Sequence, residues 1–259
     1  MMRSVGVGIL LCMGIAGTVT AQERPEGATE VPLRLEDGRL VVTVENASGE
    51  PLNFVLGAAG SLVSTWGAEE LGVGLEGATL GDLPISLAGA QVVPEKDLLL
   101  DGPFEGRIAG VLGGQSLMDY DILIDAPGRR LLLKRPGRFV QWEGVELTGA
   151  VPLQILHEYL IRTDVEVNGE IFSAHVDLSP ATMIVSSVVR DRAEVRGGRA
   201  DFRMGYASFA DRPAEFLDLP PLRAWGGDDA GVVFVGAPVA YDCAIAISWV
   251  HAEMRTCPR

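Results

Sequence analysis

The feature that most constrains the fold of this chain is an internal repeat. The segment Val44 to Glu50 places valine, an acid, asparagine and glycine in an order that returns at Val165 to Glu170. An extended apolar run follows each segment, and Gly49 corresponds to Gly169 at an offset of 120 residues. A repeated order of motifs indicates that one structural unit occurs twice in the molecule.

The ends of the two halves also match, at a nearby offset of 123 residues. Gly113 corresponds to Gly236, and Asp119 corresponds to Asp242. Because an apolar run follows each aspartate at the same distance, the two halves match in the order of their motifs as well as in composition. We therefore predict two lobes of one design.

Composition favours strands over long helices within each lobe. The 259 residues include 32 glycines, 15 prolines and only 6% aromatic residues, which suits short strands joined by tight turns. The formal net charge of −14 repels phosphate backbones, so nucleic acid is excluded as an expected partner.

The first 21 residues have the pattern of a secretory signal. A basic residue, Arg3, precedes an apolar run from Val5 to Val19, and small residues up to Ala21 form a cleavage site. An N-terminal membrane anchor is the alternative, although this apolar run is short for a spanning helix. We expect an exported mature protein, periplasmic or secreted, that has no membrane partner once the signal is removed.

A hairpin is expected at the end of the first half. Asp121 to Asp125 forms an apolar strand, Ala126 to Arg129 a turn, and Arg130 to Lys134 a returning strand. The centre of this hairpin lies near Pro127.

Adding the offset of 123 residues moves the hairpin centre to Val250 in the second half. Cys243 and Cys257 each lie seven residues from Val250 and therefore oppose each other. Opposed strand residues approach closely enough for a disulfide. An exported chain with these two cysteines is expected to hold one disulfide between them.

Each half resembles a lobe of the aspartic peptidases of the retropepsin-like and pepsin-like kind. That family has a strand ending in Asp-Thr-Gly, then an apolar pair and a short helix, and a later stretch of two apolar residues and glycine. The similar segments are Asn53 to Ser64 and His175 to Ser186, closed by Val111 to Gly113 and Phe234 to Gly236.

The resemblance implies an all-β, two-lobed fold of β-barrel character with a cleft between the lobes. It also implies short helices after Ser64 and near Ser186. The expected division is a first lobe over residues 31–135, a connection over 136–152 and a second lobe over 153–257.

The catalytic motifs depart from the family in both halves. Where the family has Asp-Thr-Gly, the first half reads Gly57-Ala58-Ala59 and the second reads Asp177-Leu178-Ser179. The family's reaction needs two carboxylates sharing one proton, so that one accepts a proton from water while the other donates to the carbonyl. Asp177 is thus the only catalytic residue that the resemblance supplies, and no cofactor is implied.

These departures lead us to expect a catalytically impaired monomer whose cleft binds a peptide or a partner protein. One alternative is an active aspartic-type endopeptidase with an atypical site that uses Asp177. Another is a structural scaffold of the cell envelope. A homodimer joining two copies of Asp177 is disfavoured, because the first half already occupies the partner position.

The sequence does not favour a metal site. The histidines, His157, His175 and His251, lack zinc-motif spacing. His175 and Asp177 share a strand face and could share a ligand, but a partly exposed histidine on a strand is favoured. Three acids, Asp119, Asp121 and Asp125, alternate along an extended segment instead of wrapping a calcium loop. We expect no metal site.

Overall fold

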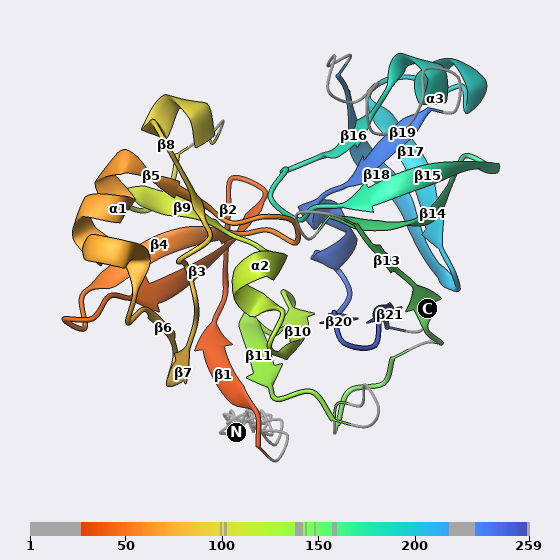
Figure 1. Ribbon diagram of the computed structural model, residues 1–259. Coiled ribbons are helices and arrows are strands. Elements are labelled where there is room, and N and C mark those ends of the chain that lie inside the picture. Colours follow the sequence, from red (N-terminus) through yellow and green to blue (C-terminus); the bar gives the residue numbers. More distant parts are fainter. Residues whose placement is uncertain are drawn as a thin grey trace, which may run out of the picture.

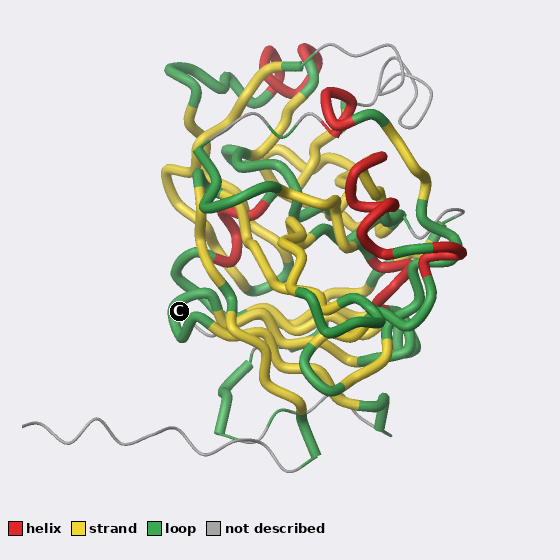
Figure 2. The backbone as a smooth tube through the Cα atoms, turned by 90° about the vertical axis from the view of Figure 1, so that its left-hand side faces the viewer, coloured by secondary structure: helices red, strands yellow, loops and turns green. Residues whose placement is uncertain are grey.

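The computed structural model describes residues 27–98, 100, 103–137, 142, 144–147, 149–156, 160–217 and 231–257. The predicted signal, residues 1–21, lies outside these described residues. Most of the described backbone is strand, and the strands form two lobes joined at one end by a shared sheet (Figure 1). The backbone trace shows the same predominance of strands, with only short helices (Figure 2). The all-β, two-lobed fold expected from the sequence is therefore confirmed.

The shared sheet, here called the interlobe sheet, has six strands in the order β1-β11-β10-β20-β21-β12. Its strands are β1 (Thr29–Pro32), β11 (Arg130–Lys134), β10 (Asp121–Asp125), β20 (Ile245–Ser248), β21 (Glu253–Thr256) and β12 (Val151–Pro152). The predicted hairpin is present with the expected bounds as β10 and β11.

Pairing between β10 and β20 reproduces the offset of the repeat. Leu123 lies opposite Ala246, and these two residues differ by 123 positions. The flanking pairs, Ile122 with Ile247 and Ile124 with Ile245, exchange when 123 is added to the first half. The two lobes therefore meet about a local twofold axis at Leu123 and Ala246.

The first lobe is an eight-stranded sheet in the order β7-β6-β3-β4-β9-β5-β8, with β2 paired to β3. Its strands are β2 (Arg34–Glu36), β3 (Arg39–Glu45), β4 (Pro51–Leu56), β5 (Leu62–Ser64), β6 (Thr79–Leu80), β7 (Leu83–Pro84), β8 (Gln91–Val93) and β9 (Ile108–Leu112). The helices beside it are α1 (Thr65–Leu71), η1 (Val73–Leu75), η2 (Glu95–Leu98) and α2 (Gly114–Leu117).

The second lobe is a seven-stranded sheet in the order β13-β14-β15-β19-β16-β18-β17. Its strands are β13 (Gln154–Ile155), β14 (Ile161–Val167), β15 (Glu170–Val176), β16 (Met183–Val185), β17 (Arg199–Met204), β18 (Ala207–Phe216) and β19 (Val232–Val235). Its helices are α3 (Ser187–Arg192) and η4 (Ala237–Ala240). Because β14 also pairs with β17, the strands from β14 to β19 close into a barrel.

Two serines begin the expected short helices. The Ser64 hydroxyl accepts a hydrogen bond from the Gly67 N–H at 2.8 Å, and the Ser186 hydroxyl accepts one from the Val189 N–H at 3.5 Å. These N-caps satisfy backbone donors that a helix start leaves unpaired. The sequence-based expectation of helices after Ser64 and near Ser186 is confirmed.

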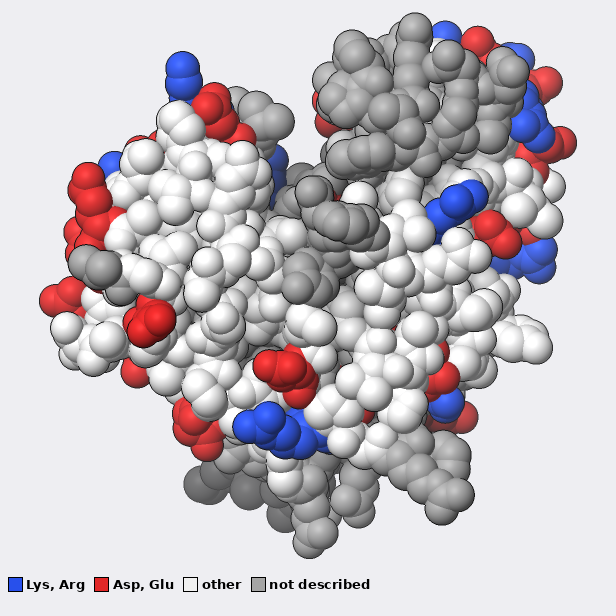
Figure 3. Space-filling model, in the orientation of Figure 1, with Lys and Arg blue, Asp and Glu red and all other residues white. Residues whose placement is uncertain are grey.

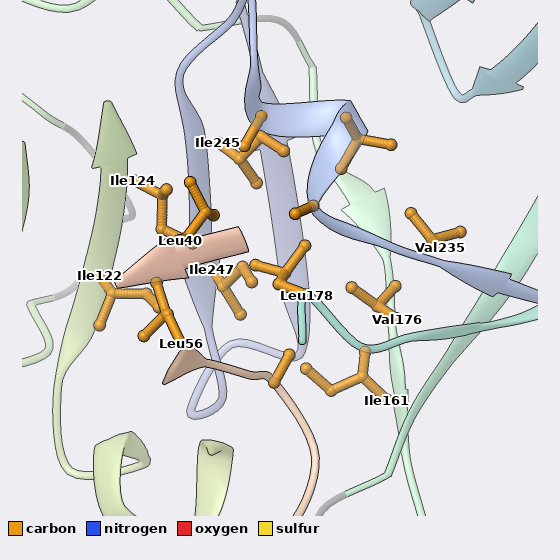
Figure 4. Packing of buried hydrophobic residues seen from close by; sticks show 14 of the residues in the cluster. Leu40, Leu56, Ile122, Ile124, Ile161, Val176, Leu178, Val235, Ile245 and Ile247 are labelled. Carbon is orange, nitrogen blue, oxygen red and sulfur yellow. The ribbon is translucent and has the colours of Figure 1, made fainter. Parts of the chain in front are cut away.

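The interlobe sheet contributes one face to the main core. Ile122 and Ile124 from β10 and Ile245 and Ile247 from β20 are fully buried, and they lie near Leu178 of the second lobe (Figure 4). Strand residues alternate between faces, so Leu123 points to the opposite side and joins a smaller cluster. Burial of apolar surface from both halves thus fixes the two lobes to each other.

A disulfide joins Cys243 and Cys257, as predicted, with the Cα atoms 5.6 Å apart. The sequence placed these residues directly opposite each other, but the register differs by one position. The Cys257 N–H donates to the Ala244 carbonyl at 3.2 Å, and Ile245 pairs with Thr256. The hairpin is therefore centred between Val250 and His251, and the bond is diagonal.

Removing the disulfide is expected to lower the free energy of unfolding by about 3 kcal/mol, because the bond closes a short loop and restricts the unfolded chain. The variant replaces both Cys243 and Cys257 by alanine, and urea unfolding gives the measurement. Reducing the wild-type protein should reproduce the loss, while the variant should not respond to reductant. Equal urea midpoints for variant and wild type would contradict the prediction.

Candidate functional site

The candidate site lies in two loops that leave equivalent strands. Gly57 follows β4 and Asp177 follows β15. The Gly57 N–H donates to the Leu112 carbonyl at 2.9 Å, and the Asp177 N–H donates to the Val235 carbonyl at 3.1 Å. Both loops are therefore anchored by the same backbone bond, although only the second carries an acid.

Gly57 and Asp177 face each other across the junction between the lobes. A Cβ atom built on Gly57 would lie 3.4 Å from Asp177 Oδ1. The same Cβ would lie only 2.8 Å from Val111 Cγ1. The structure thus brings together the two positions that the sequence compared, and residue 57 carries no carboxylate on its side of the pair.

The Asp177 carboxyl is held by backbone and hydroxyl groups. The Ser179 N–H donates to Asp177 Oδ1 at 3.1 Å. Burial raises the pKa of Asp177 above its usual value, while the Ser179 N–H, the Ser179 hydroxyl and the Ala58 N–H oppose that rise. Within the described part of the chain, no second acid is among the groups that act on this carboxyl.

Asp177 as a whole residue is partly exposed, although its carboxyl lies deep enough for burial to raise the pKa. On the face shown in Figure 3, uncharged residues cover most of the described surface between the two lobes, and Lys, Arg, Asp and Glu lie mainly toward its edges. A carboxyl with a raised pKa is protonated over a wider pH range than usual. In that form it donates a hydrogen bond, for example to a carbonyl oxygen.

The expectation that the His175 side chain is partly exposed is wrong. His175 is only 2% exposed, and its ring centroid lies 5.4 Å from that of Phe234. Burial lowers the pKa of His175, and the nearby Arg162 lowers it further. Of the other histidines, His251 Nε2 lies 2.8 Å from the Gly137 carbonyl oxygen, and His157 lies outside the described residues.

The aspartates near the first hairpin do not gather around a common point. Asp119 is exposed, Asp121 is fully buried, and Asp125 accepts a hydrogen bond from the Arg130 guanidinium at 2.8 Å. Among the residues that the structure describes, no three His, Cys, Asp or Glu side chains are grouped so that they could hold a metal ion.

Tyr241 is the site residue that sequence reasoning missed. Its hydroxyl lies 2.6 Å from the Gly38 carbonyl oxygen in the first lobe and 3.1 Å from the Ala181 carbonyl oxygen in the loop that follows Asp177. A signal was present, because the repeat aligns Tyr241 with Met118, a residue of quite different chemistry.

The fold is similar to that of a solved aspartic proteinase from Irpex lacteus, with a TM-score of 0.56. The similarity covers 89% of this chain and 97% of that chain, at 11% sequence identity. At this identity the likeness concerns the fold, which is that of a two-lobed acid protease. No protein-family profile and no curated protein sequence matches the chain. In the described part of the chain, no helix is both long enough and apolar enough to cross a membrane.

Proposed function

We propose that this protein is an exported, aspartic-proteinase-like protein that binds an extended peptide or a protein segment between its lobes and cleaves it poorly or not at all. The observation that carries the proposal is the position of Gly57 opposite Asp177, where a Cβ on residue 57 would lie 3.4 Å from Asp177 Oδ1. The disulfide supports export, since such bonds persist in oxidising compartments.

Loss of one carboxylate removes half of the acid–base pair that this kind of hydrolysis needs. A lone Asp177 can hold a proton or accept one, but it cannot do both in the same step. Losing a general acid or base costs about 10²- to 10⁴-fold in rate. Ala58 and Leu178 also lack the hydroxyl groups that the family's motif carries next to its aspartates.

Binding does not need the missing carboxylate. An extended peptide is held mainly by main-chain hydrogen bonds and by side-chain pockets. The protonated Asp177 carboxyl adds a donor for a peptide carbonyl, and the chain retains this group while losing its catalytic partner. A peptide-binding protein is therefore favoured over a peptidase.

The test uses the mature protein and a library of degenerate decapeptides. Gel filtration reports which peptides the protein retains, and mass spectrometry reports cleavage. We expect retention without cleavage. Cleavage that is lost in Asp177→Asn would support the active endopeptidase instead. If no peptide is retained or cleaved, the scaffold is favoured.

Peptide affinity is expected to fall as pH rises, because only the neutral Asp177 carboxyl donates a hydrogen bond. Burial raises the pKa of Asp177 above 3.8. As the pH rises through the raised pKa, the carboxyl loses its proton, and the peptide complex loses the free energy that this hydrogen bond contributes. Asp177→Asn keeps a neutral donor and should bind with little pH dependence. Calorimetric titration of a retained peptide between pH 3 and 8 checks this, and equal pH profiles for both proteins would contradict it.

A further inference from the structure

Tyr241 connects the two lobes beside Asp177. It directly follows η4 in the second lobe, and its hydroxyl lies 2.6 Å from the Gly38 carbonyl oxygen and 3.1 Å from that of Ala181. Gly38 belongs to the turn between β2 and β3, which reaches from the first lobe toward the second (Figure 1). The single phenolic hydrogen is therefore shared between two carbonyl oxygens, one from each lobe.

The turn at Gly38 is shaped for this close approach. Its φ angle of 71° lies in the left-handed region that favours glycine. A Cβ on Gly38 would lie 3.0 Å from the Tyr241 hydroxyl oxygen and 3.0 Å from Ala181 Cβ. A side chain at position 38 would thus separate the turn from the second lobe.

The Tyr241 hydroxyl stays protonated under ordinary conditions. Burial raises its pKa to about 12, although Arg212 and Arg39 lower it and Asp37 raises it slightly. Arg212 itself pairs with Asp242. The phenol is therefore a constant hydrogen-bond donor, and it does not switch with pH in the physiological range.

The loop that Tyr241 contacts is the loop that holds the Asp177 carboxyl. Ser179 in this loop donates its N–H to Asp177 at 3.1 Å, and the next residue, Pro180, accepts a hydrogen bond from the Ala237 N–H at 3.0 Å. Tyr241 then binds the following carbonyl, that of Ala181. Only one peptide unit separates the Tyr241 contact from the Pro180 contact, so the phenol extends the support of this loop to the first lobe.

We propose that Tyr241 is a positioning residue for Asp177, which fixes the Ser179–Ala181 loop against the first lobe so that the Ser179 N–H stays directed at the carboxyl. The inference deepens the proposed function, because Asp177 is the group on which that function rests. Its geometry stands without a ligand, so it can be tested on the free protein.

The decisive variant is Tyr241→Phe, which removes the hydroxyl and keeps the ring. Exchange of the Ser179 amide hydrogen, followed by NMR, should become about 3- to 10-fold faster once the loop loses this bond. The pKa of Asp177, followed through its carboxyl ¹³C shift, should rise by about half a unit to one unit, because the Ser179 N–H stabilises the charged form.

Tyr120→Phe is the matched control. The Tyr120 hydroxyl also donates to a backbone carbonyl, that of Pro84 at 2.7 Å, but within the first lobe. This variant should lose comparable stability and leave the Ser179 amide and the Asp177 titration unchanged. An unchanged Asp177 titration in Tyr241→Phe, or an equal shift in Tyr120→Phe, would overturn the proposal. Neither result depends on whether a peptide binds, so failure here is distinct from failure of the proposed function.

Discussion

Replacing Gly236 by alanine is expected to prevent the second lobe from folding normally. A Cβ at this position would lie 2.2 Å from the Thr182 carbonyl oxygen and 2.8 Å from that of Pro180. Both atoms belong to the backbone of the loop that follows Asp177, so neither can move without displacing that loop. We expect a cost above about 4 kcal/mol, a large part of the 5 to 15 kcal/mol that stabilises a typical domain.

The same effect is expected for Gly113, the corresponding glycine of the first lobe. A Cβ on Gly113 would lie 2.2 Å from the Ala59 carbonyl oxygen, so Gly113→Ala should be equally damaging. Gly149→Ala is the control, since its Cβ would meet only the ring of Tyr206, which is 78% exposed and free to turn. Thermal unfolding followed by circular dichroism measures all three variants. A Gly236→Ala protein that melts with the wild type would refute this account of the motif.

These glycines show which parts of the fold the sequence could predict. The closing motif and the hairpin recur at one offset, 123 residues, and the β10–β20 pairing follows that same offset at Leu123 and Ala246. The repeat predicts this part of the fold because residues that match in the two halves of the sequence occupy equivalent positions about the twofold axis.

The first strand of each lobe could have been found in the same way. Val31-Pro32-Leu33 and Val151-Pro152-Leu153 are identical triplets at an offset of 120 residues. Pro32 pairs with Arg130 in β11, and Pro152 pairs with Glu253 in β21, so the triplets mark β1 and β12. The signal is short, which is why composition and periodicity alone do not reveal it.

The part of the candidate site that follows the repeat could be predicted from the sequence. The part that departs from the repeat could not. Gly57 and Asp177 occupy equivalent loops, so comparison of the halves placed them together. The repeat aligns Tyr241 with Met118, which has no hydroxyl, so it marks the position as different but does not predict the contact with Gly38, which is 203 residues away in the chain. Such contacts depend on how the two folded lobes pack against each other, and this packing cannot be predicted from local sequence.

Supplying the missing acid is expected to produce peptidase activity, provided that space is made for it. Gly57→Asp places a carboxyl opposite Asp177, but its Cβ would lie 2.8 Å from Val111 Cγ1. Valine is stiff about χ1, so it does not readily turn away. The double variant Gly57→Asp/Val111→Ala should therefore exceed the single variant Gly57→Asp. Two close carboxylates share one proton, which restores an acid and a base in one site.

We expect the double variant to cleave quenched fluorescent decapeptides about 10²- to 10⁴-fold faster than the wild type at acidic pH, the gain associated with one general acid or base. Gly57→Asn/Val111→Ala controls for size, because asparagine has the shape of aspartate but does not ionise. Adding Asp177→Asn to the double variant should remove the gain, since the pair is broken again. A folded double variant that cleaves no faster than its asparagine control would show that Gly57 is not the position from which the catalytic carboxylate is missing.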